Sequence, residues 1–490
     1  MALGPALDHA QVMERTAARF FGEPPGRPYR ALRSDDRSRY GDLFVAIRGN
    51  VYDSHRSIPL LPGRGIRGVV GEDPPAAGFP LPYYQVSSSR RALGRLAQAF
   101  SGDPAAALRV LGVTGTNGKS TTVRLLATIL EAAGRFSGWM GTVTCHIAGE
   151  EHPSSLTTPG PVELARGMSE HLAAGGTDMV LEVSSHALDQ ERIAGIPLAG
   201  ALLTNISRDH HDYHGSPLAY RRAKLRLFEH LTPGGPAALP ELDSTALVEL
   251  ALRGSRRITF GLSPGADARP LRYSLSPLGL AGTLEICGAR VEVQSSLAGR
   301  HNLLNILGAT ALAAGLGIPA TAIAGGIFRT TPVPGRMEEI PGREGRVFVD
   351  YAHTPDALRA VLDSVRELTR GRVLVVFGCG GERDRGKRPQ MGRVVEERSD
   401  RAYVTSDNPR GEDPGRIIDE ILQGVDQPSR MVAEPDRRAA IGLALADLGR
   451  EDTLVVAGRG HETCQQILGR ALPFDDRRVV AELMRGGGAG

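Results

Sequence analysis

The sequence contains little cysteine and no long apolar run. Its cysteines are widely separated and match neither a metal site nor a disulfide framework, which indicates a reducing compartment: Cys145, Cys287, Cys379 and Cys464. No apolar run approaches the roughly 20 residues of a membrane-spanning helix, and the N-terminal stretch lacks the basic and apolar regions of a secretion signal. We therefore expect a cytoplasmic protein without a membrane span.

The sequence also has little excess of one sign of charge over the other. The 58 Lys and Arg residues nearly balance 55 Asp and Glu residues, so the formal net charge is only +3. Because no long basic run is interleaved with aromatic side chains, the composition argues against nucleic acid as a partner. A small anionic ligand would have to be met by a local pocket instead.

What the sequence does contain is a series of short apolar strands followed by polar loops. At 490 residues the chain is long enough for two to four domains. Strand-like pieces between Pro- and Gly-rich turns indicate a small N-terminal α/β domain over residues 1–106. Strands alternating with helical patterns indicate a mainly parallel sheet over 107–332, then a second doubly wound sheet over 333–490 after the linker RTTPVPGR. The predicted fold class is therefore α/β throughout.

The stretch GVTGTNGKSTT, residues 112–122, has the pattern of a phosphate-binding loop. It follows an apolar run and precedes a helical pattern. In such a turn the backbone N–H groups and the helix N-terminus face one point, Lys119 reaches the outer phosphates and the Ser120 hydroxyl can hold a metal ion. The strict motif requires glycine where this chain has Val113, and we expect Gly115 to provide the turn. The loop predicts a nucleoside triphosphate, without indicating the acceptor.

Carboxylates and histidines follow two strands of the central segment. Glu182 ends the apolar run DMVLEV, where a carboxylate is costly unless it serves a cation such as Mg²⁺ or caps the next helix. The stretch TNISRDHHDYHGS contains two aspartates and three histidines close together. A zinc site and a polar surface turn are both open interpretations, since the spacing matches no usual zinc motif.

Three polar loops follow strands of the C-terminal segment. They are GCGGERDRGKRPQMG, TSDNPRGEDP and AGRGHETCQ. The basic side chains of the first are suited to carboxylate or phosphate, although a basic run is also typical of a solvated surface. Because ligands of open α/β sheets bind beyond the carboxyl ends of the strands, the three loops together predict a binding cleft.

The order of these motifs resembles that of the Mur ligases of peptidoglycan synthesis. The matching segments run from about 110 to 480: GTNGKSTT, LTTP, EVSSHALDQ, TNISRDHHDYHGS, GRHNLLN, PGRMEEI, VDYAHTPDAL, GCGGERDRGKRPQMG, SDNPR and GRGHE with PFDD. GTNGKST alone would also suit a folylpolyglutamate synthetase. DYAHTPD, SDNPR and GRGHE point to the MurE branch.

The resemblance implies a three-domain architecture and a reaction. A small N-terminal α/β domain would bind the UDP substrate, a central P-loop ATPase domain ATP, and a C-terminal Rossmann-like domain the incoming amino acid. The implied enzyme is an ATP-dependent amide (peptide) ligase that phosphorylates the D-glutamate carboxylate of UDP-N-acetylmuramoyl-L-alanyl-D-glutamate. The amine of meso-diaminopimelate then attacks the acyl phosphate. This UDP-muramoyl dipeptide and meso-diaminopimelate are the implied partners, ATP and Mg²⁺ the cofactors, and we expect a monomer.

The resemblance also assigns site residues. The positions implied for ATP are Gly115, Thr116, Asn117, Gly118, Lys119, Ser120, Thr121, Asn302, Arg336 and Asp350. Those for the muramoyl dipeptide are Thr157, Thr158, Ser184, Gln190 and Arg192. Those for the amino acid are Arg383, Asp407, Asn408, Pro409, Arg410, Gly458 and Glu462. The metal positions are Ser120, Glu182, His210 and Lys224, and the catalytic ones Lys119, His210 and Lys224.

Two of these positions have a chemical reason for their role. Lys224 aligns with a lysine that the family carbamylates to N6-carboxylysine, and an unmodified ammonium would repel Mg²⁺. Arg410 belongs to the DNPR loop that accompanies meso-diaminopimelate in the family. Diaminopimelate carries a second carboxylate that lysine lacks, and a guanidinium can pair with it.

Some family elements are altered, mainly on the side of the ATP and UDP substrates. The DSR element is not cleanly present in SDDRSRYGDLFVAIRG, Leu156 replaces a polar residue in LTTP, Arg459 replaces the usual lysine in GRGHE, and PAALPELDST lacks a NADD-like element. Two alternatives therefore stay open. One is a MurE-derived amide ligase of a specialised pathway with a different carboxylate acceptor. The other is a nonenzymatic ATP-dependent switch, which would leave the amino-acid loops unexplained.

Overall fold

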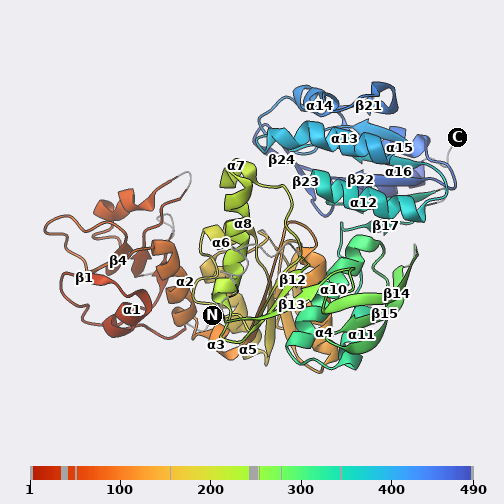
Figure 1. Ribbon diagram of the computed structural model, residues 1–490. Coiled ribbons are helices and arrows are strands. Elements are labelled where there is room, and N and C mark those ends of the chain that lie inside the picture. The colour runs from red at the N-terminus through yellow and green to blue at the C-terminus, as the bar shows by residue number, and fades with distance from the viewer. Residues whose placement is uncertain are drawn as a thin grey trace.

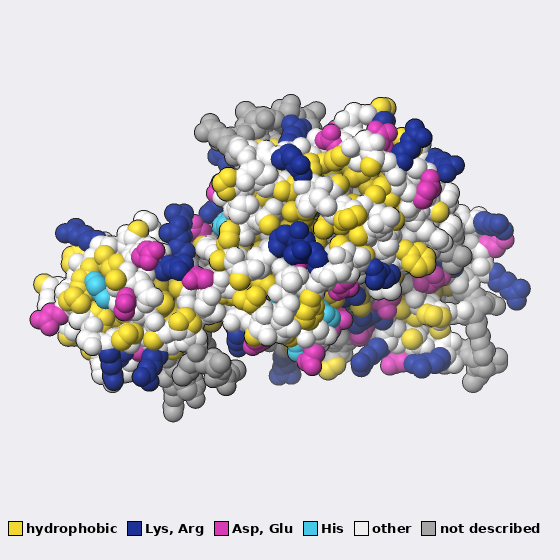
Figure 2. All heavy atoms as spheres, turned by 90° about the horizontal axis from the view of Figure 1, so that it is seen from below, with side chains coloured by type: hydrophobic (Ala, Val, Ile, Leu, Met, Phe, Trp, Pro, Cys, Tyr) yellow, Lys and Arg dark blue, Asp and Glu magenta, His cyan; other side chains and the backbone are white. Residues whose placement is uncertain are grey.

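The computed structural model describes residues 4–34, 42–49, 52–154, 156–241, 252, 254–276, 279–342 and 345–486. Three main sheets follow one another along the chain (Figure 1), with the C-terminal body above the central one and the N-terminal body at its side. Basic and acidic side chains are interspersed on the face shown in Figure 2. None of the described helices is long and apolar enough to cross a membrane. The α/β class and three-domain order are confirmed, while the boundaries at 106 and 332 remain predictions.

The N-terminal domain is a five-stranded sheet in the order β1-β5-β4-β3-β2, with only β1 antiparallel to its neighbour. Its elements are α1 (His9–Thr16), β1 (Arg19–Phe21), β2 (Leu32–Arg33), β3 (Leu43–Val45), η1 (Ser54–Leu60), β4 (Gly68–Gly71), β5 (Tyr83–Gln85) and α2 (Ser89–Phe100). Asp8 and Gln11 form a capping box that starts α1, and Ser88 caps α2. The altered DSR element lies mostly in residues 35–41, outside the described residues.

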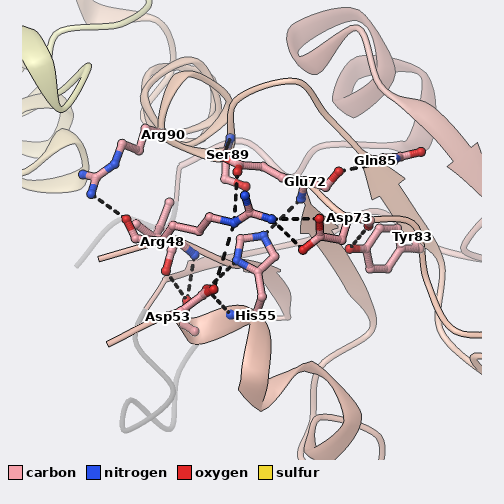
Figure 3. Close-up of polar contacts among 11 residues, drawn as sticks. Arg48, Asp53, His55, Glu72, Asp73, Tyr83, Gln85, Ser89 and Arg90 are labelled. Carbon is pink, nitrogen blue, oxygen red and sulfur yellow. Dashed lines mark hydrogen bonds and ion pairs between the residues drawn. The ribbon is translucent and has the colours of Figure 1, made fainter. Parts of the chain in front are cut away.

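A polar cluster in this domain ties β4 to α2 (Figure 3). The Arg48 guanidinium lies 2.6 Å from an Asp73 oxygen and 3.4 Å from Glu72. Glu72 in turn accepts a hydrogen bond from the backbone of Ser89 in the first turn of α2. The His55 ring accepts from the Glu72 backbone N–H. Since Arg48 is half exposed and its charges are screened, the cluster orients the loops more than it stabilises the fold.

The central domain is an eleven-stranded sheet in the order β16-β15-β14-β13-β12-β11-β6-β10-β7-β8-β9. Its first half contains α3 (Pro104–Ala107), β6 (Arg109–Thr114), α4 (Lys119–Ala132), β7 (Ser137–Met140), β8 (Thr144–Ile147), β9 (Glu150–Pro153), α5 (Pro161–Ala173), β10 (Asp178–Glu182), α6 (Ser185–Asp189) and β11 (Gly200–Leu203). Its second half contains α7 (His211–His214), α8 (Pro217–Leu225), η2 (Arg226–His230), β12 (Pro236–Pro240), β13 (Arg256–Phe260), β14 (Ala268–Ser276), β15 (Gly279–Ile286), β16 (Ala289–Ser295), α10 (Arg300–Gly315) and α11 (Ala320–Arg329).

The neighbouring strands β13, β12, β11, β6, β10 and β7 of this sheet are parallel, as expected for the phosphate-loop domain. At the edge beyond β7, β8 and β9 are antiparallel. The alternation of strands with helices is wrong over 268–295, where β14, β15 and β16 form an antiparallel meander. The burial of β16 alternates along its second half, with Val291, Val293 and Ser295 facing inward. This period of two is the signal of a half-buried strand, and it was available in the sequence.

The C-terminal domain is a six-stranded sheet in the order β17-β18-β22-β19-β20-β21, in which only β17 is antiparallel. Its elements are β17 (Glu338–Ile340), β18 (Arg346–Asp350), α12 (Pro355–Leu368), β19 (Val373–Phe377), η3 (Arg385–Lys387), α13 (Arg388–Arg398), β20 (Arg401–Val404), α14 (Pro414–Leu422), η4 (Pro428–Arg430), β21 (Met431–Ala433), α15 (Arg437–Ala446), β22 (Thr453–Ala457), the hairpin β23 (Cys464–Ile467) and β24 (Arg470–Pro473), and α16 (Asp476–Gly486). The parallel strands β18, β19, β20 and β22 bring the polar loops that follow them to one edge of the sheet.

Candidate active site

The phosphate-loop pattern forms the turn between β6 and α4. Val113 lies within β6 and pairs with Glu182 of β10, so the turn needs no glycine there. Gly115 has a φ of +151°, and a Cβ at this position would lie 1.8 Å from the Thr204 hydroxyl. Gly118, with a φ of +83°, is the N-cap of α4. Gly115 therefore allows the loop to pass close to Thr204, and it provides the turn in place of the usual first glycine.

Two lysines converge on the carbonyl oxygen of Gly115. Lys224 of α8 donates from its Nζ to this oxygen at 2.7 Å, and Lys119 of α4 donates to it at 3.1 Å. Burial lowers the pKa of both ammonium groups, and the charge of Lys119 lowers that of Lys224 further. Lys119 beside the N-terminus of α4 forms a site suited to a polyphosphate.

The buried carboxylate of Glu182 lies beside this loop. Its oxygens accept hydrogen bonds from Ser120 Oγ at 3.0 Å and from the backbone N–H and hydroxyl of Thr142 at 2.9 and 2.8 Å. Ser120 and Glu182 thus present neighbouring oxygen ligands, which fits Mg²⁺ because it commonly takes one or two carboxylates together with substrate phosphates. Among the described residues, no group of three or more His, Cys, Asp or Glu side chains could hold a metal ion, so nothing here favours the zinc interpretation.

His210 is the N-cap of the short helix α7 and has a φ of +52°. Its Nε2 lies 3.3 Å from Asp209, whose other oxygen accepts the His210 backbone N–H. Burial lowers the pKa of His210 to about 3. Burial opposes the charge on Asp209, but His210, His353 and Lys387 together lower the pKa of this carboxyl to about 2. Asp209 is therefore an anion on the wall between the central and C-terminal domains.

A cavity of about 320 Å³ opens between the phosphate loop and the C-terminal domain. It collects seven of the residues predicted for ATP: Asn117, Gly118, Ser120, Thr121, Asn302, Arg336 and Asp350. The predicted Gly115, Thr116 and Lys119 lie in the loop but not on its wall. The sequence motifs did not predict the apolar part of the wall, because single apolar residues carry no local signal of a binding site. These residues are Phe260, Leu297, Val333, Ala357 and Val361.

The residues predicted for the muramoyl dipeptide form one hydrogen-bonded chain. Thr158 Oγ1 donates to the carbonyl of Glu182 at 2.9 Å and accepts from the Ser184 backbone N–H. Arg192 donates to the Thr158 carbonyl at 2.7 Å and to the Gln190 side chain at 2.9 Å. The hydrogen-bonded chain extends to Thr157 through the hydroxyl of Thr142, which also hydrogen-bonds to Glu182. This hydrogen-bonded chain therefore lies next to the Glu182 carboxylate beside the phosphate loop.

A second cavity, of about 190 Å³, lies between the loop after β11 and the C-terminal loops. All residues predicted for the amino acid except Pro409 line it: Arg383, Asp407, Asn408, Arg410, Gly458 and Glu462. On the central-domain side its wall is formed by Asp209, His210 and Asp212. The three polar loops thus form one cleft, as predicted, and the central domain completes it.

Hydrogen bonds fix the orientation of Asn408 in this cavity. Its Oδ1 accepts from Arg459 at 3.1 Å and from the Gln466 backbone N–H at 2.9 Å, so its Nδ2 faces Glu462 at 2.8 Å. Arg459 is fully buried and also donates to the Phe474 carbonyl. Burial and the nearby Asp407 raise the pKa of Glu462. Arg459, the arginine in place of the usual lysine, therefore positions Asn408 without lining the cavity itself.

Three charged side chains of the second cavity, Arg383, Asp407 and Arg410, form no ion pair among the described residues. Arg410 donates to the Gly381 carbonyl at 2.7 Å, but no carboxylate of the described chain forms an ion pair with it or with Arg383. Burial and the charge of Arg383 lower the pKa of Arg410. Asp407 Oδ2 is buried, and no described side chain or backbone group hydrogen-bonds to it. The cavity wall therefore presents a cation, Arg410, and an anion, Asp407, that do not form an ion pair with each other.

The basic run 383–388 serves two different purposes. Arg388 is fully buried and forms ion pairs with Glu412 and Glu420, with each of three hydrogen bonds at 2.9 Å. Its role is therefore structural. Arg383 is exposed and lines the second cavity. The run is thus neither a uniform ligand surface nor a uniform solvated face.

Lysine usage is a sequence signal that motif reading missed. Only three of the 58 Lys and Arg residues are lysines, namely Lys119, Lys224 and Lys387. The first two meet at Gly115, and Lys387 lines the second cavity. An ammonium is a compact point charge whose pKa shifts readily on burial, unlike a guanidinium. In a chain that otherwise uses arginine for positive charge, each lysine marks a site.

Comparison with known proteins agrees with this arrangement. The family models "Mur ligase middle domain" and "Mur ligase, glutamate ligase domain" match residues 113–313 and 335–460. A protein of Alkalilimnicola ehrlichii named UDP-N-acetylmuramoyl-L-alanyl-D-glutamate–2,6-diaminopimelate ligase is 41% identical, covering 94% of this chain and 95% of its own. One of the same name from Geobacter metallireducens is 40% identical, covering 93% and 94%.

Solved structures show the same fold. A structure of a UDP-N-acetylmuramoyl-L-alanyl-D-glutamate–2,6-diaminopimelate ligase has a TM-score of 0.68 and 29% identity, covering 99% of this chain and 100% of its own. MurF of Thermotoga maritima, solved in complex with ADP, has a TM-score of 0.60 at 19% identity, covering 93% and 97%, and supports the fold alone. The chain therefore belongs to the Mur ligase family and is an ATP-dependent ligase.

Proposed function

We propose that this ligase joins meso-diaminopimelate to the D-glutamate carboxylate of UDP-N-acetylmuramoyl-L-alanyl-D-glutamate, with ATP cleavage and an acyl-phosphate intermediate. The carrying observation is that Arg410 and Asp407 in the second cavity form no ion pair among the described residues. An amino-acid terminus is a carboxylate next to an ammonium, and the wall offers Arg410 next to Asp407. The names of the relatives and the family's motifs support the same substrates.

The predicted site residues are proposed to act in three groups. The ATP group comprises Gly115 to Thr121 with Asn302, Arg336 and Asp350. The dipeptide group comprises Thr157, Thr158, Ser184, Gln190 and Arg192. The amino-acid group comprises Arg383, Asp407 to Arg410, Gly458 and Glu462. Cytoplasmic location and a monomeric state remain predictions.

Phosphoryl transfer depends mainly on alignment and charge neutralisation. Lys119 and the N–H groups at the start of α4 would bind the phosphates, while Thr158 and Arg192 would hold the acceptor near Glu182. Mg²⁺ held by Ser120, Glu182, His210 and a carbamylated Lys224 would neutralise charge on the transferred group. Arg410 and Asp407 would orient the amino acid for attack from the opposite domain.

Phosphate release from ATP should require both the muramoyl dipeptide and the amino acid. The measurement is phosphate release by purified protein across a small matrix of UDP-muramoyl acceptors and amino acids. Turnover with a different carboxylate acceptor would identify the specialised ligase instead. Equal ATP turnover with neither substrate would contradict amide ligation altogether.

Replacing Arg410 by alanine should selectively impair the use of diaminopimelate. A charge-assisted hydrogen bond contributes about 1.5–3 kcal/mol, so the loss of kcat/KM should be roughly tenfold to a hundredfold. Lysine, which lacks the distal carboxylate, should be used no worse by the variant than by the wild type. Arg385→Ala, at the exposed ion pair with Glu420, is the matched control. An equal loss for both amino acids, or a wild type that prefers lysine, would contradict this role.

A further inference from the structure

The second cavity carries a histidine that the roles above do not use. His353 follows β18 and directly precedes Thr354, the N-cap of α12, whose side chain accepts a hydrogen bond from the Ala357 backbone N–H. Its ring is partly buried and lines the cavity. The end of β18 and the cap of α12 therefore fix the backbone on both sides of His353.

Hydrogen bonding fixes the tautomer of His353. Its Nδ1 lies 2.8 Å from the carbonyl oxygen of Tyr351. A carbonyl oxygen can only accept, so Nδ1 carries the proton and the neutral ring keeps its lone pair on Nε2. No described residue hydrogen-bonds to Nε2. This nitrogen is therefore an unused acceptor of a side chain on the cavity wall.

The surroundings of His353 keep the ring neutral. Lys387 Nζ donates to the His353 carbonyl at 2.9 Å. Burial, and then the charge of Lys387, lower the pKa of the imidazole below its ordinary value. The titratable and charged groups that act on the ring come from the elements around it: Asp209, His210, Arg336, Tyr351, Lys387 and His461.

The position of His353 suits the reacting end of the amino acid. Arg410 and Glu462 line the cavity from the C-terminal domain, while Asp209 and His210 line it from the central domain. His353 and Asp209 lie close enough to influence each other's pKa. The pKa of Arg410 is influenced instead by Arg383, Asp407 and Glu462. An amino acid that is anchored at Arg410 and spans the cavity would therefore bring its other end to Asp209 and His353.

We propose that His353 is a catalytic residue that removes a proton from the incoming ammonium through Nε2. The inference rests on the proposed function, because an ammonium has no lone pair and cannot attack an acyl phosphate. Nε2 takes one proton, and the free amine forms the C–N bond. The C–O bond to phosphate then breaks, and the second proton of the nitrogen leaves with the phosphate. The imidazolium returns its proton to solvent.

The test compares two nucleophiles in the variant His353→Asn. The asparagine amide can keep the hydrogen bond to Tyr351 but offers nothing in place of Nε2. Reaction with diaminopimelate at neutral pH should fall roughly 10²- to 10⁴-fold, the usual contribution of a general base. Hydroxylamine is largely unprotonated at neutral pH and needs no base. Hydroxamate formation from the acyl phosphate should therefore stay within about threefold of the wild type, well inside a general-base effect.

The pH profile gives a second readout. Below the pKa of the amine, the variant's rate with diaminopimelate should rise about tenfold per pH unit, because only the free amine reacts. The wild type should keep its activity to a lower pH, since a histidine with a lowered pKa stays unprotonated below its ordinary range. His353→Gln serves as a second variant, the exposed His152→Asn as a control, and ADP binding by calorimetry as a check of folding.

The outcomes separate this inference from the proposed function. A wild type that does not use diaminopimelate with the muramoyl dipeptide contradicts the proposed function. An active wild type with equal losses for both nucleophiles in His353→Asn assigns the residue a structural role and overturns the inference. An unimpaired variant overturns it as well.

Discussion

Replacing Lys224 by alanine is expected to lower the ligase kcat roughly 10²- to 10³-fold, the scale of losing one preorganised electrostatic group at a reaction centre. Lys224 is buried and donates to the Gly115 carbonyl, which satisfies one of its three N–H donors. An ammonium in this place would repel Mg²⁺, whereas a carbamate would bind it. We therefore expect a modified lysine to act as a metal ligand.

Added short carboxylates should restore part of the activity of Lys224→Ala, because formate or acetate can occupy the place of the carbamate. Phosphate release measures the activity, and the intact mass of the wild type with and without bicarbonate measures the modification. The exposed Arg222→Ala, on the same helix, is the control and should remain active. A fully active Lys224→Ala, or one that no carboxylate rescues, would rule out the carbamate.

Replacing Arg437 by methionine is expected to destabilise the C-terminal domain by about 3–5 kcal/mol, the cost of leaving one partner of a buried ion pair alone. Arg437 and Asp476 are both fully buried, and two hydrogen bonds of 2.8 Å join them. Arg437 also donates to the carbonyls of Ser406 at 3.4 Å and Ala457 at 2.9 Å. These carbonyls directly precede Asp407 and Gly458, so the same guanidinium holds two loops of the amino-acid cavity together.

Hydrogen exchange is the suitable measurement, because a three-domain chain does not unfold in a single step. Peptides from residues 346–457 should exchange roughly 10²- to 10⁴-fold faster in Arg437→Met, as 1.4 kcal/mol corresponds to a factor of ten. The adjacent Arg438→Met is the control, since its ion pair with Glu482 is half exposed and contributes at most about 1 kcal/mol. Similar exchange in the two variants would contradict the structural role.

The fold class and much of the site could be predicted from sequence because their signals are local. The phosphate loop, the apolar strands and the polar loops after them each depend on neighbouring residues and on the rule that parallel strands end at one edge. The same reasoning missed the meander at 268–295, where a period of two was read as part of a strand-and-helix alternation. The substrate-side alteration at residues 35–41 lies outside the described residues.

The sequence by itself determined the α/β class and the three-domain order, and it predicted the residues for ATP and for an amino acid. Only the tertiary structure decided which charges stay unpaired and which are neutralised. Arg388 and Arg383 belong to one basic run, yet one is bound to two glutamates and the other lines the cavity. The physical reason is that burial and ion pairing depend on groups brought together from distant parts of the chain, and these interactions set the charge of each side chain.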